Sequence, residues 1–144
     1  MKKLKAKVKT TKKAKRKPGI NSRRKGAVGE VEFAHYLTDH GLPAERGQQH
    51  AGGVESPDVK CPSLPHTHFE VKRVQAGSPY KWLEQAVRDA GKGKLPAVAH
   101  RRNGKEWIAI VPMEDYVRML ILVERHHAEL PAKQRDPDAE LLGE

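Results

Sequence analysis

The sequence predicts an α/β fold, with helices packed on a sheet, from two observations. Helical and strand-like segments alternate along the chain in the order helix, short strands, helix, strand pair, helix. The chain has 144 residues, enough for one ordinary domain with one hydrophobic core. Its longest apolar run has five residues (119–123), far short of a membrane helix, and its single cysteine cannot form an intrachain disulfide. We therefore expect a cytoplasmic protein without a membrane segment.

Charge divides the chain into three parts. Of the 28 Lys and Arg residues, 13 lie in positions 1–25, which leaves 15 basic and 18 acidic residues, a net charge of −3, in the remainder. The first 17 residues have too few large apolar side chains to form a core, so we expect a disordered basic arm over residues 1–22. Residues 23–127 then form the folded domain and residues 128–144 an acidic tail. Such an arm indicates nucleic acid as the partner, although a solubilising lysine tail has the same composition.

The first helix is expected at residues 25–41, where Gly41 ends it. At 100° per residue its apolar arc consists of Ala27, Val31, Phe33, Ala34 and Leu37. Glu30 lies inside this arc, whereas Glu32 lies on the solvent arc. A carboxylate on the core side is costly unless it is paired, hydrogen-bonded or close to a metal ion. Glu30 is therefore a candidate site residue; the alternative is a glutamate that reaches solvent from the helix end.

Two strands are expected next, at residues 54–60 and 67–74. In the second, a period of two places Glu70 and Lys72 on one face and the apolar residues between them on the other. A hairpin would bring Asp58 beside Glu70. Two converging carboxylates offer oxygen ligands to Mg²⁺, and a neighbouring ammonium can orient the attacking water or stabilise the transition state of phosphodiester hydrolysis. An E-x-K triplet alone is weak evidence, because it arises often by chance.

A second helix is predicted from Pro79 to about Ala90, with Ser78 as its N-cap. Its expected buried arc consists of Trp82, Leu83, Ala86, Val87 and Ala90. Gln85 flanks this arc. Because Trp82 and Trp107 each follow the apolar pattern of their element, we expect both in the core rather than as platforms for base stacking.

The last part of the chain predicts a strand pair and a helix. Residues 95–101 and 105–111 have strand character, and Asn103-Gly104 between them indicates a two-residue hairpin turn. Residues 113–127 predict a closing amphipathic helix.

Pro57-Asp58 followed by Glu70-Val71-Lys72 resembles the motif of the PD-(D/E)xK nucleases of the restriction-endonuclease-like superfamily. The resemblance implies a restriction-endonuclease-like core, in which a central mixed β-sheet is flanked by helices. It further implies that Asp58, Glu70 and the Val71 carbonyl bind metal and that Lys72 acts on water or on the transition state. Cys61, His66 and His68 are residue types that bind zinc, but they lack the spacing of a structural zinc site.

Arg24-Lys25-Gly26 leading to Glu30 resembles the first helix of Holliday junction resolvases of the archaeal and phage type. By this resemblance Glu30 is a further metal ligand, either direct or through water, and Gln85 occupies the place of a helix glutamine or lysine found in many superfamily members. The implied enzyme is a Mg²⁺-dependent DNA endonuclease, with Mn²⁺ as a substitute, that acts on four-way or branched DNA in recombination and repair. Because resolving a two-fold junction requires paired nicks in two strands, we expect a homodimer of one-site subunits. The host would be a bacterium, an archaeon or a phage-infected cell.

There are two alternatives. One is a repair or restriction-like nuclease acting on other DNA structures, and the other is a non-catalytic basic DNA-binding protein. The residues expected to contact DNA are Lys12, Lys13, Lys15, Arg16, Lys17, Arg23, Arg24, Lys25 and Arg73.

Overall fold

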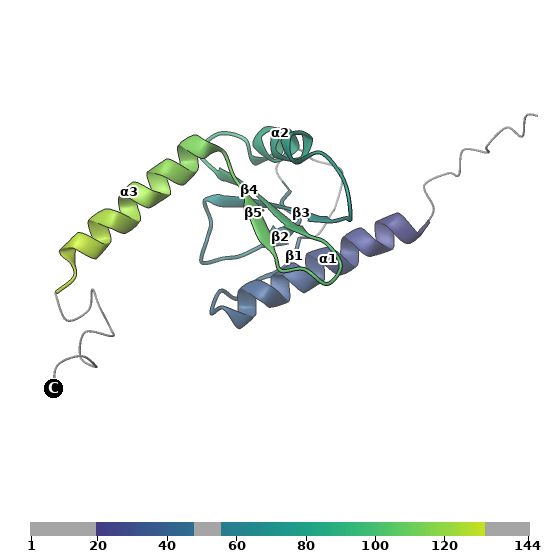
Figure 1. The fold of residues 1–144 in the computed structure, drawn as a ribbon. Helices are drawn as coiled ribbons and strands as arrows, with labels where there is room; N and C mark the ends of the chain where they lie inside the picture. Colours follow the sequence, from purple (N-terminus) through teal and green to yellow (C-terminus); the bar gives the residue numbers. More distant parts are fainter. Residues whose placement is uncertain (1–19, 48–55, 132–144) are drawn as a thin grey trace, which may run out of the picture.

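The computed structural model describes residues 20–47 and 56–131 of the chain (Figure 1). These residues form three helices and five strands. In chain order they are α1 (Ile20–Asp39), β1 (Glu45–Arg46), β2 (Val59–Lys60), β3 (Thr67–Arg73), α2 (Pro79–Ala90), β4 (Leu95–Arg101), β5 (Ile108–Ile110) and α3 (Met113–Glu129).

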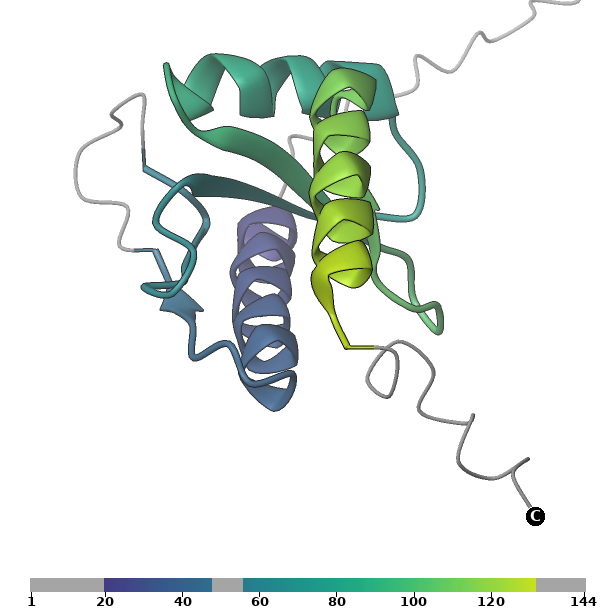
Figure 2. The same ribbon diagram turned by 90° about the vertical axis from the view of Figure 1, so that its left-hand side faces the viewer.

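The strands form one mixed sheet in the order β1-β2-β3-β4-β5, which confirms the predicted α/β architecture. β3 and β4 are parallel and joined through α2, whereas the other neighbours are antiparallel. Figure 2 shows the sheet between two helices, with α1 against one face and α2 against the other. β3 therefore contacts both helices and presents alternate side chains to each.

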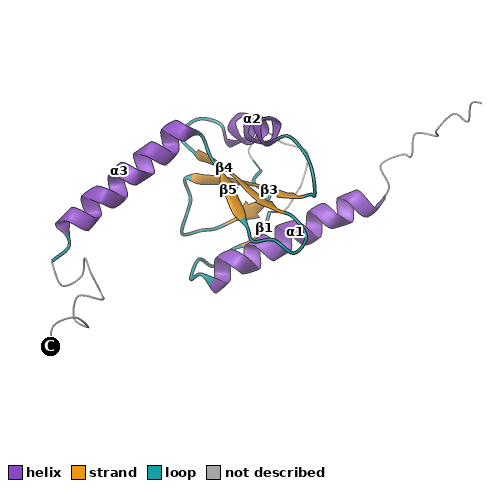
Figure 3. Ribbon diagram, viewed as in Figure 1, coloured by secondary structure: helices purple, strands orange, loops and turns teal. Residues whose placement is uncertain are grey.

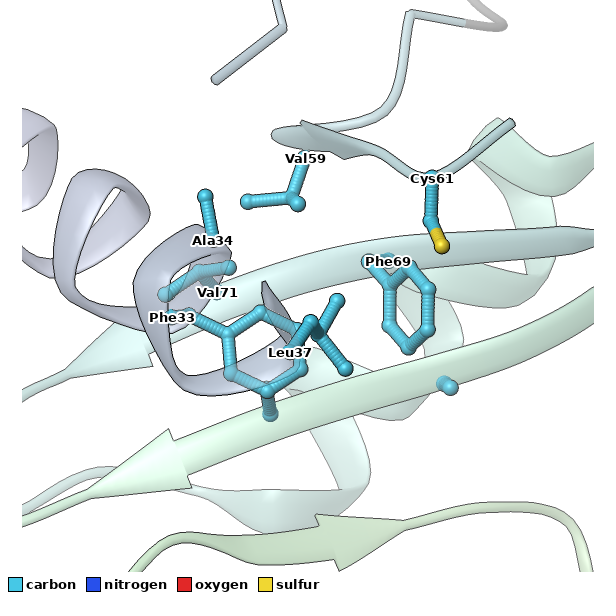
Figure 4. Packing of buried hydrophobic residues seen from close by; sticks show 9 residues of the cluster. Phe33, Ala34, Leu37, Val59, Cys61, Phe69 and Val71 are labelled. Carbon is cyan, nitrogen blue, oxygen red and sulfur yellow. The ribbon is translucent and has the colours of Figure 1, made fainter. Parts of the chain in front are cut away.

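The hydrophobic core lies between α1 and the sheet (Figure 4). Phe33 of α1 is its centre, because its ring contacts Phe69 edge-on at 5.3 Å between centroids and Trp107 at 5.1 Å. The other buried members are Ala34, Leu37, Val59, Cys61, Val71, Ala97 and Ala99. Burying these side chains fixes α1 along the sheet and thus orients the α1 residues that point beyond the core.

The face of α1 differs in part from the predicted arc. Phe33, Ala34 and Leu37 are buried, but Val31 is 41% exposed, so its assignment to the buried arc was wrong. Val31 lies at the margin of the arc, and the helix touches the sheet only along a narrower stripe that includes Glu30. On α2, Val87 is likewise exposed rather than buried, whereas Ala86 and Ala90 are buried as predicted.

Several boundaries also differ from the sequence-based expectations. α1 begins at Ile20 rather than at residue 25, and β2 and β5 are shorter than expected. β1 was not predicted, because a two-residue strand has no periodicity to detect. Residues 1–19 and 132–144, which contain most of the predicted basic arm and acidic tail, lie outside the described residues.

The expected two-residue hairpin between β4 and β5 is a longer loop. The Lys105 amide donates to the Arg102 carbonyl at 3.2 Å, and Gly104 has φ +66°, so Asn103-Gly104 does form the centre of a tight turn. Strand pairing, however, begins only at His100 opposite Ile108. The turn is therefore separated from the ladder, and the loop around it stays free to line the surface beside β3.

α3 extends away from the sheet, as Figures 1 and 3 show, and none of its side chains is buried. Seven of its large apolar side chains are 43–71% exposed; they are Met113, Tyr116, Val117, Leu120, Ile121, Leu122 and Val123. Within residues 20–47 and 56–131, no helix combines the length and apolar character needed to cross a bilayer. The apolar face of α3 is thus a surface feature of this domain.

Candidate active site

Asp58 is held at the point where β2 begins. Val59 pairs with Phe69 in the antiparallel register, so Asp58 lies opposite Glu70, as the expected hairpin required. The Asp58 amide donates to the Phe69 carbonyl at 2.9 Å, and the Val71 amide donates to Asp58 Oδ2 at 2.8 Å. Backbone groups on both sides therefore fix the position and the orientation of this carboxylate.

Glu70, Lys72 and Gln85 form a hydrogen-bonded chain between β3 and α2. Lys72 Nζ donates to Glu70 Oε1 at 2.5 Å and to Gln85 Oε1 at 3.0 Å. The predicted strand period accounts for the first contact, and the placement of α2 across β3 accounts for the second. Ser78 accepts a hydrogen bond from the Lys81 amide and so caps the helix that carries Gln85.

Glu30 enters the same region from α1. It is 8% exposed, and its Oε2 accepts a hydrogen bond from Arg46 Nε at 2.5 Å. The orientation deduced from helical periodicity is therefore correct. Arg46 was not anticipated, because it follows a loop and lies on the two-residue strand β1, where no pattern singles it out.

These side chains line one open cavity of about 520 Å³. We call it the carboxylate cavity; the residues used in the argument below are Glu30, Asp58, Glu70, Lys72 and Gln85. Lys25 of α1 and Asn103 of the β4–β5 loop lie at its margin. The cavity thus brings together the five predicted catalytic side chains, which come from four separate segments of the chain.

Asp58 is the carboxyl of the cavity that lies in the least favourable surroundings for its charge. Burial of Asp58, together with the nearby charges of Glu70 and Glu30, raises the pKa of its carboxyl from the ordinary 3.8 to about 6. The Val71 amide and the Lys72 ammonium act in the opposite direction but do not compensate. A carboxylate held at this cost is a common feature of functional sites.

The donor set fits a hard divalent cation, because carboxylate oxygens are the ligands that Mg²⁺ prefers and a cation would relieve the repulsion around Asp58. In the part of the chain that the structure describes, no three His, Cys, Asp or Glu side chains converge as a ready-made metal cluster. Glu30 is turned toward Arg46 and Glu70 toward Lys72, so these two cations neutralise part of the acidic charge.

Glu32 does not lie free on the solvent arc, and that prediction was wrong. Its Oε2 accepts a hydrogen bond from Arg73 Nε at 2.7 Å and lies 4.0 Å from Arg101 Nη1. The reason is that α1 packs close enough to β3 and β4 for a residue beside the buried stripe to reach cations at the ends of both strands. Glu32 thus links α1 to the sheet without lining the carboxylate cavity.

The basic residues expected to contact DNA are only partly placed. Arg24 and Lys25 are exposed on α1, and Lys25 lies at the margin of the carboxylate cavity. Arg73 is half-buried and pairs with Glu32. The side chains of Lys12, Lys13, Lys15, Arg16, Lys17 and Arg23 lie outside what the structure describes.

The cysteine and histidines near β3 have other surroundings. Cys61 is buried in the core with its Sγ 3.3 Å from Ser63 Oγ, and His66 is exposed. His68 is buried on the α2 face of β3, and neither ring nitrogen has a hydrogen-bond partner. Burial lowers the pKa of His68 and so favours its neutral form, although the nearby charge of Glu70 acts in the opposite direction.

The two predicted core tryptophans have different environments. Trp107 packs against the core cluster, as expected. Trp82 is only half-buried, on the opposite face of the sheet, with its ring centroid 4.8 Å from that of His100. It lies outside the core because the short helix α2 packs on the sheet through its small residues Ala86 and Ala90. Pattern alone could not distinguish these two locations.

Residues 21–136 match the family described as "Phage putative PDDEXK endonuclease". The chain belongs to this family. The match runs from α1 through α3, so every residue lining the carboxylate cavity falls within it. Comparison with curated proteins and with solved structures found no significant match. The expected PD-(D/E)xK nuclease superfamily is confirmed, and DNA is the substrate class that an endonuclease family implies.

Proposed function

We propose that the protein is a Mg²⁺-dependent DNA endonuclease that hydrolyses phosphodiester bonds in four-way or branched DNA. The observation that carries the proposal is the meeting of Glu30, Asp58, Glu70 and Lys72 in one cavity of a PDDEXK-family chain. A non-catalytic DNA-binding protein would have no reason to hold three acidic groups together at the expense described for Asp58.

Asp58, Glu70 and the Val71 carbonyl would hold the metal, with Glu30 as a further ligand. When bound, Mg²⁺ supplies Lewis-acid stabilisation of the phosphate and makes a coordinated water more acidic; Mn²⁺ would supply the same chemistry. The surroundings of Asp58 support this assignment, because its pKa is raised first by burial and then by repulsion from Glu70 and Glu30, and that repulsion becomes attraction for a cation.

Lys72 would act on the attacking water or on the negative charge that develops at phosphorus. Its ammonium is held between Glu70 and Gln85, so its direction is set by one residue of its own strand and one of the facing helix. Gln85 is neutral and cannot replace the charge of Lys72, but it fixes where that charge lies. We therefore assign Gln85 as a positioning residue.

Branched DNA is the proposed substrate class, and a homodimer is the proposed working unit. A four-way junction has two-fold symmetry, and its resolution requires two nicks, so two one-site subunits related by a two-fold axis match it. The exposed apolar face of α3 supports self-association. An antiparallel α3 pair would bring the first turn of each helix, which holds Glu114 and Asp115, beside the last turn of its partner, which holds His126 and His127, in keeping with two-fold symmetry.

The test compares a labelled four-way junction with a linear duplex of matched sequence, with and without Mg²⁺. We expect wild-type protein to produce symmetric paired nicks in the junction. Asp58→Asn and Glu70→Gln should each abolish cleavage and leave junction binding within a few-fold, because they remove ligand charge without adding bulk. Light scattering of Leu120→Glu against wild type reports whether α3 carries the dimer.

Each proposed part has its own contrary outcome. Comparable cleavage by either variant in Mg²⁺ would show that the metal assignment is wrong. Unpaired or single-strand nicks, or equal cleavage of linear duplex, would favour a repair or restriction-like nuclease. Binding without cleavage under all metal conditions would favour a non-catalytic DNA-binding protein.

A further inference from the structure

A second cavity, of about 560 Å³, lies on the α2 side of the sheet. Trp82 and His100 form its aromatic wall, and Ile108 and Ile110 of β5 form an aliphatic one. We call it the tryptophan cavity. Ile108 is 55% exposed although it is a large apolar residue on a strand, so the cavity presents apolar surface to solvent.

The aromatic wall is held in place from two sides. His100 is buried, and its Nδ1 lies 2.8 Å from the Lys72 carbonyl oxygen, which links the wall to the strand of the carboxylate cavity. The backbone at Gly77 passes so close to Trp82 that a Cβ built there would lie 2.1 Å from the indole ring. The loop at Gly77 and the His100 ring thus restrain the orientation of the indole before any ligand binds.

The tryptophan cavity adjoins the carboxylate cavity along two loops. In the segment after β3, Gln75 lines the carboxylate cavity and Gly77 the tryptophan cavity. In the β4–β5 loop, Asn103 lines the first, whereas Arg102 and Lys105 line the second. A ligand that spans these loops would therefore reach both cavities.

The charge at the tryptophan cavity suits a nucleotide strand. Arg102 and Lys105 are exposed cations at its rim, accompanied by a single acid, Glu106. Flat aromatic and aliphatic walls with cations at the mouth match the combination of a nucleobase and its phosphates. The volume of about 560 Å³ leaves room for one base.

We propose that the tryptophan cavity binds one nucleobase extruded from its pair at the branch point of the DNA substrate, stacked against Trp82, while the adjoining backbone lies in the carboxylate cavity. This inference rests on the proposed function and adds a source of selectivity to it. A base within a continuous duplex is paired and stacked on both sides, whereas a base pair at a branch point lacks a continuous stacking neighbour on one side, so extruding its base costs less unstacking energy. The site therefore selects DNA structure rather than sequence.

The experiment measures binding in EDTA, where no cleavage occurs, to a four-way junction and to a matched linear duplex. Trp82→Leu should weaken junction binding by roughly five-fold or more, the lower end for loss of one stacked base, and leave duplex binding unchanged. Trp82→Phe, which keeps an aromatic face, should retain most of the preference. Tyr80→Leu is the matched control, because Tyr80 is an aromatic residue of the same helix that is 81% exposed and does not line the cavity.

A fluorescent base reports the contact directly. The emission of 2-aminopurine placed at the branch point should change when wild-type protein binds, because the base leaves the DNA stack for the indole, and should change less when Trp82→Leu binds; the same probe inside an arm should show no difference. Should Trp82→Leu fail to fold, Ile108→Glu places a negative charge at the solvent-exposed mouth and should lower junction binding similarly.

The outcomes separate this inference from the proposed nuclease. A folded Trp82→Leu or Ile108→Glu protein with the wild-type preference for junctions, or an equal change in 2-aminopurine emission in both complexes, would overturn the stacking site even if cleavage proceeds. Loss of the preference in Trp82→Leu, together with no cleavage by the wild-type protein in Mg²⁺, would retain the stacking site and reject the nuclease. Wild-type protein that binds no branched DNA would overturn the inference as well.

Discussion

Glu30 and Glu32 are chemically identical residues with different expected roles. We expect Glu30→Gln to slow cleavage by about 100-fold or more, as for the loss of about 3 kcal/mol of electrostatic stabilisation. Glu32→Gln should change the cleavage rate little, because Glu32 binds Arg73 outside the carboxylate cavity. Its partly exposed ion pair should contribute about 1 kcal/mol or less to folding.

The measurement for this pair is the single-turnover cleavage rate of each variant, with circular dichroism and thermal unfolding as controls. Glutamine preserves volume and helix propensity, so both proteins should remain folded. Equal rates would contradict the assignment of Glu30 to the cavity. A larger loss in Glu32→Gln would make the Arg73 contact the important one.

Asp58 should make stability depend on pH in the metal-free protein. The pKa of its carboxyl is about 6 in the folded chain and 3.8 ordinarily, so its ionisation opposes folding. Protonated Asp58 therefore contributes to the free energy of unfolding; this contribution is fully present below pH 3.8 and is lost as pH rises to about 6. We expect Tm of wild type, relative to Asp58→Asn, to fall across this window in EDTA.

The comparison with Asp58→Asn isolates one group, because His68 has the opposite effect. Burial lowers the pKa of His68, so its contribution to stability is lost as pH falls below its ordinary 6.5. His68 is present in both proteins, and its effect therefore cancels in the difference. If the difference in Tm stayed constant with pH, the pKa of Asp58 would be the same in the folded protein as in the unfolded chain.

At the scale of elements, Gly29 sets the distance between α1 and β3. A Cβ built at this position would lie 2.6 Å from Arg73 Cβ, which is too close without movement of the helix or the strand. We expect Gly29→Ala to destabilise the fold and, because Glu30 is the next residue, to slow cleavage. Urea unfolding and single-turnover rates measure the two effects.

Gly26→Ala is the matched control for stability. It lies one turn earlier on α1, and a Cβ there would meet nothing within 4 Å. Alanine should therefore stabilise the helix, by up to about 1 kcal/mol. If Gly29→Ala proved as stable as Gly26→Ala, the close packing of α1 on β3 would not be what holds Glu30 in place.

The elements that the sequence predicted best are those with long periodic patterns. β3, α2 and β4 were expected within one residue of their ends, since burial on one face imposes a clear period. The direction of Glu30 and the meeting of Asp58 with Glu70 followed from the same periods. Arg46, the ion pair of Glu32 and the position of Trp82 did not, because each depends on how separate elements pack rather than on local pattern.

At the scale of the whole molecule, the uneven charge predicts how binding responds to salt. Deleting residues 1–17 removes ten lysine and arginine residues, so affinity for junction and linear duplex should fall by a similar factor. The dependence of log affinity on log salt concentration should also become less steep. Titrations of both DNAs at several salt concentrations measure this. An unchanged slope would show that the arm does not reach phosphate.

The central position of β3 in the sheet limits how far the residues of the site can move. It is hydrogen-bonded to neighbours on both sides and lies between α1 and α2, so it belongs to the part of a protein that opens last in local unfolding. Glu70 and Lys72 therefore sit on a rigid base, while the loops around Gln75 and Asn103 can adjust to a large, irregular ligand. The strand thus keeps the acidic side chains in fixed positions, while its flanking loops can move to fit the DNA.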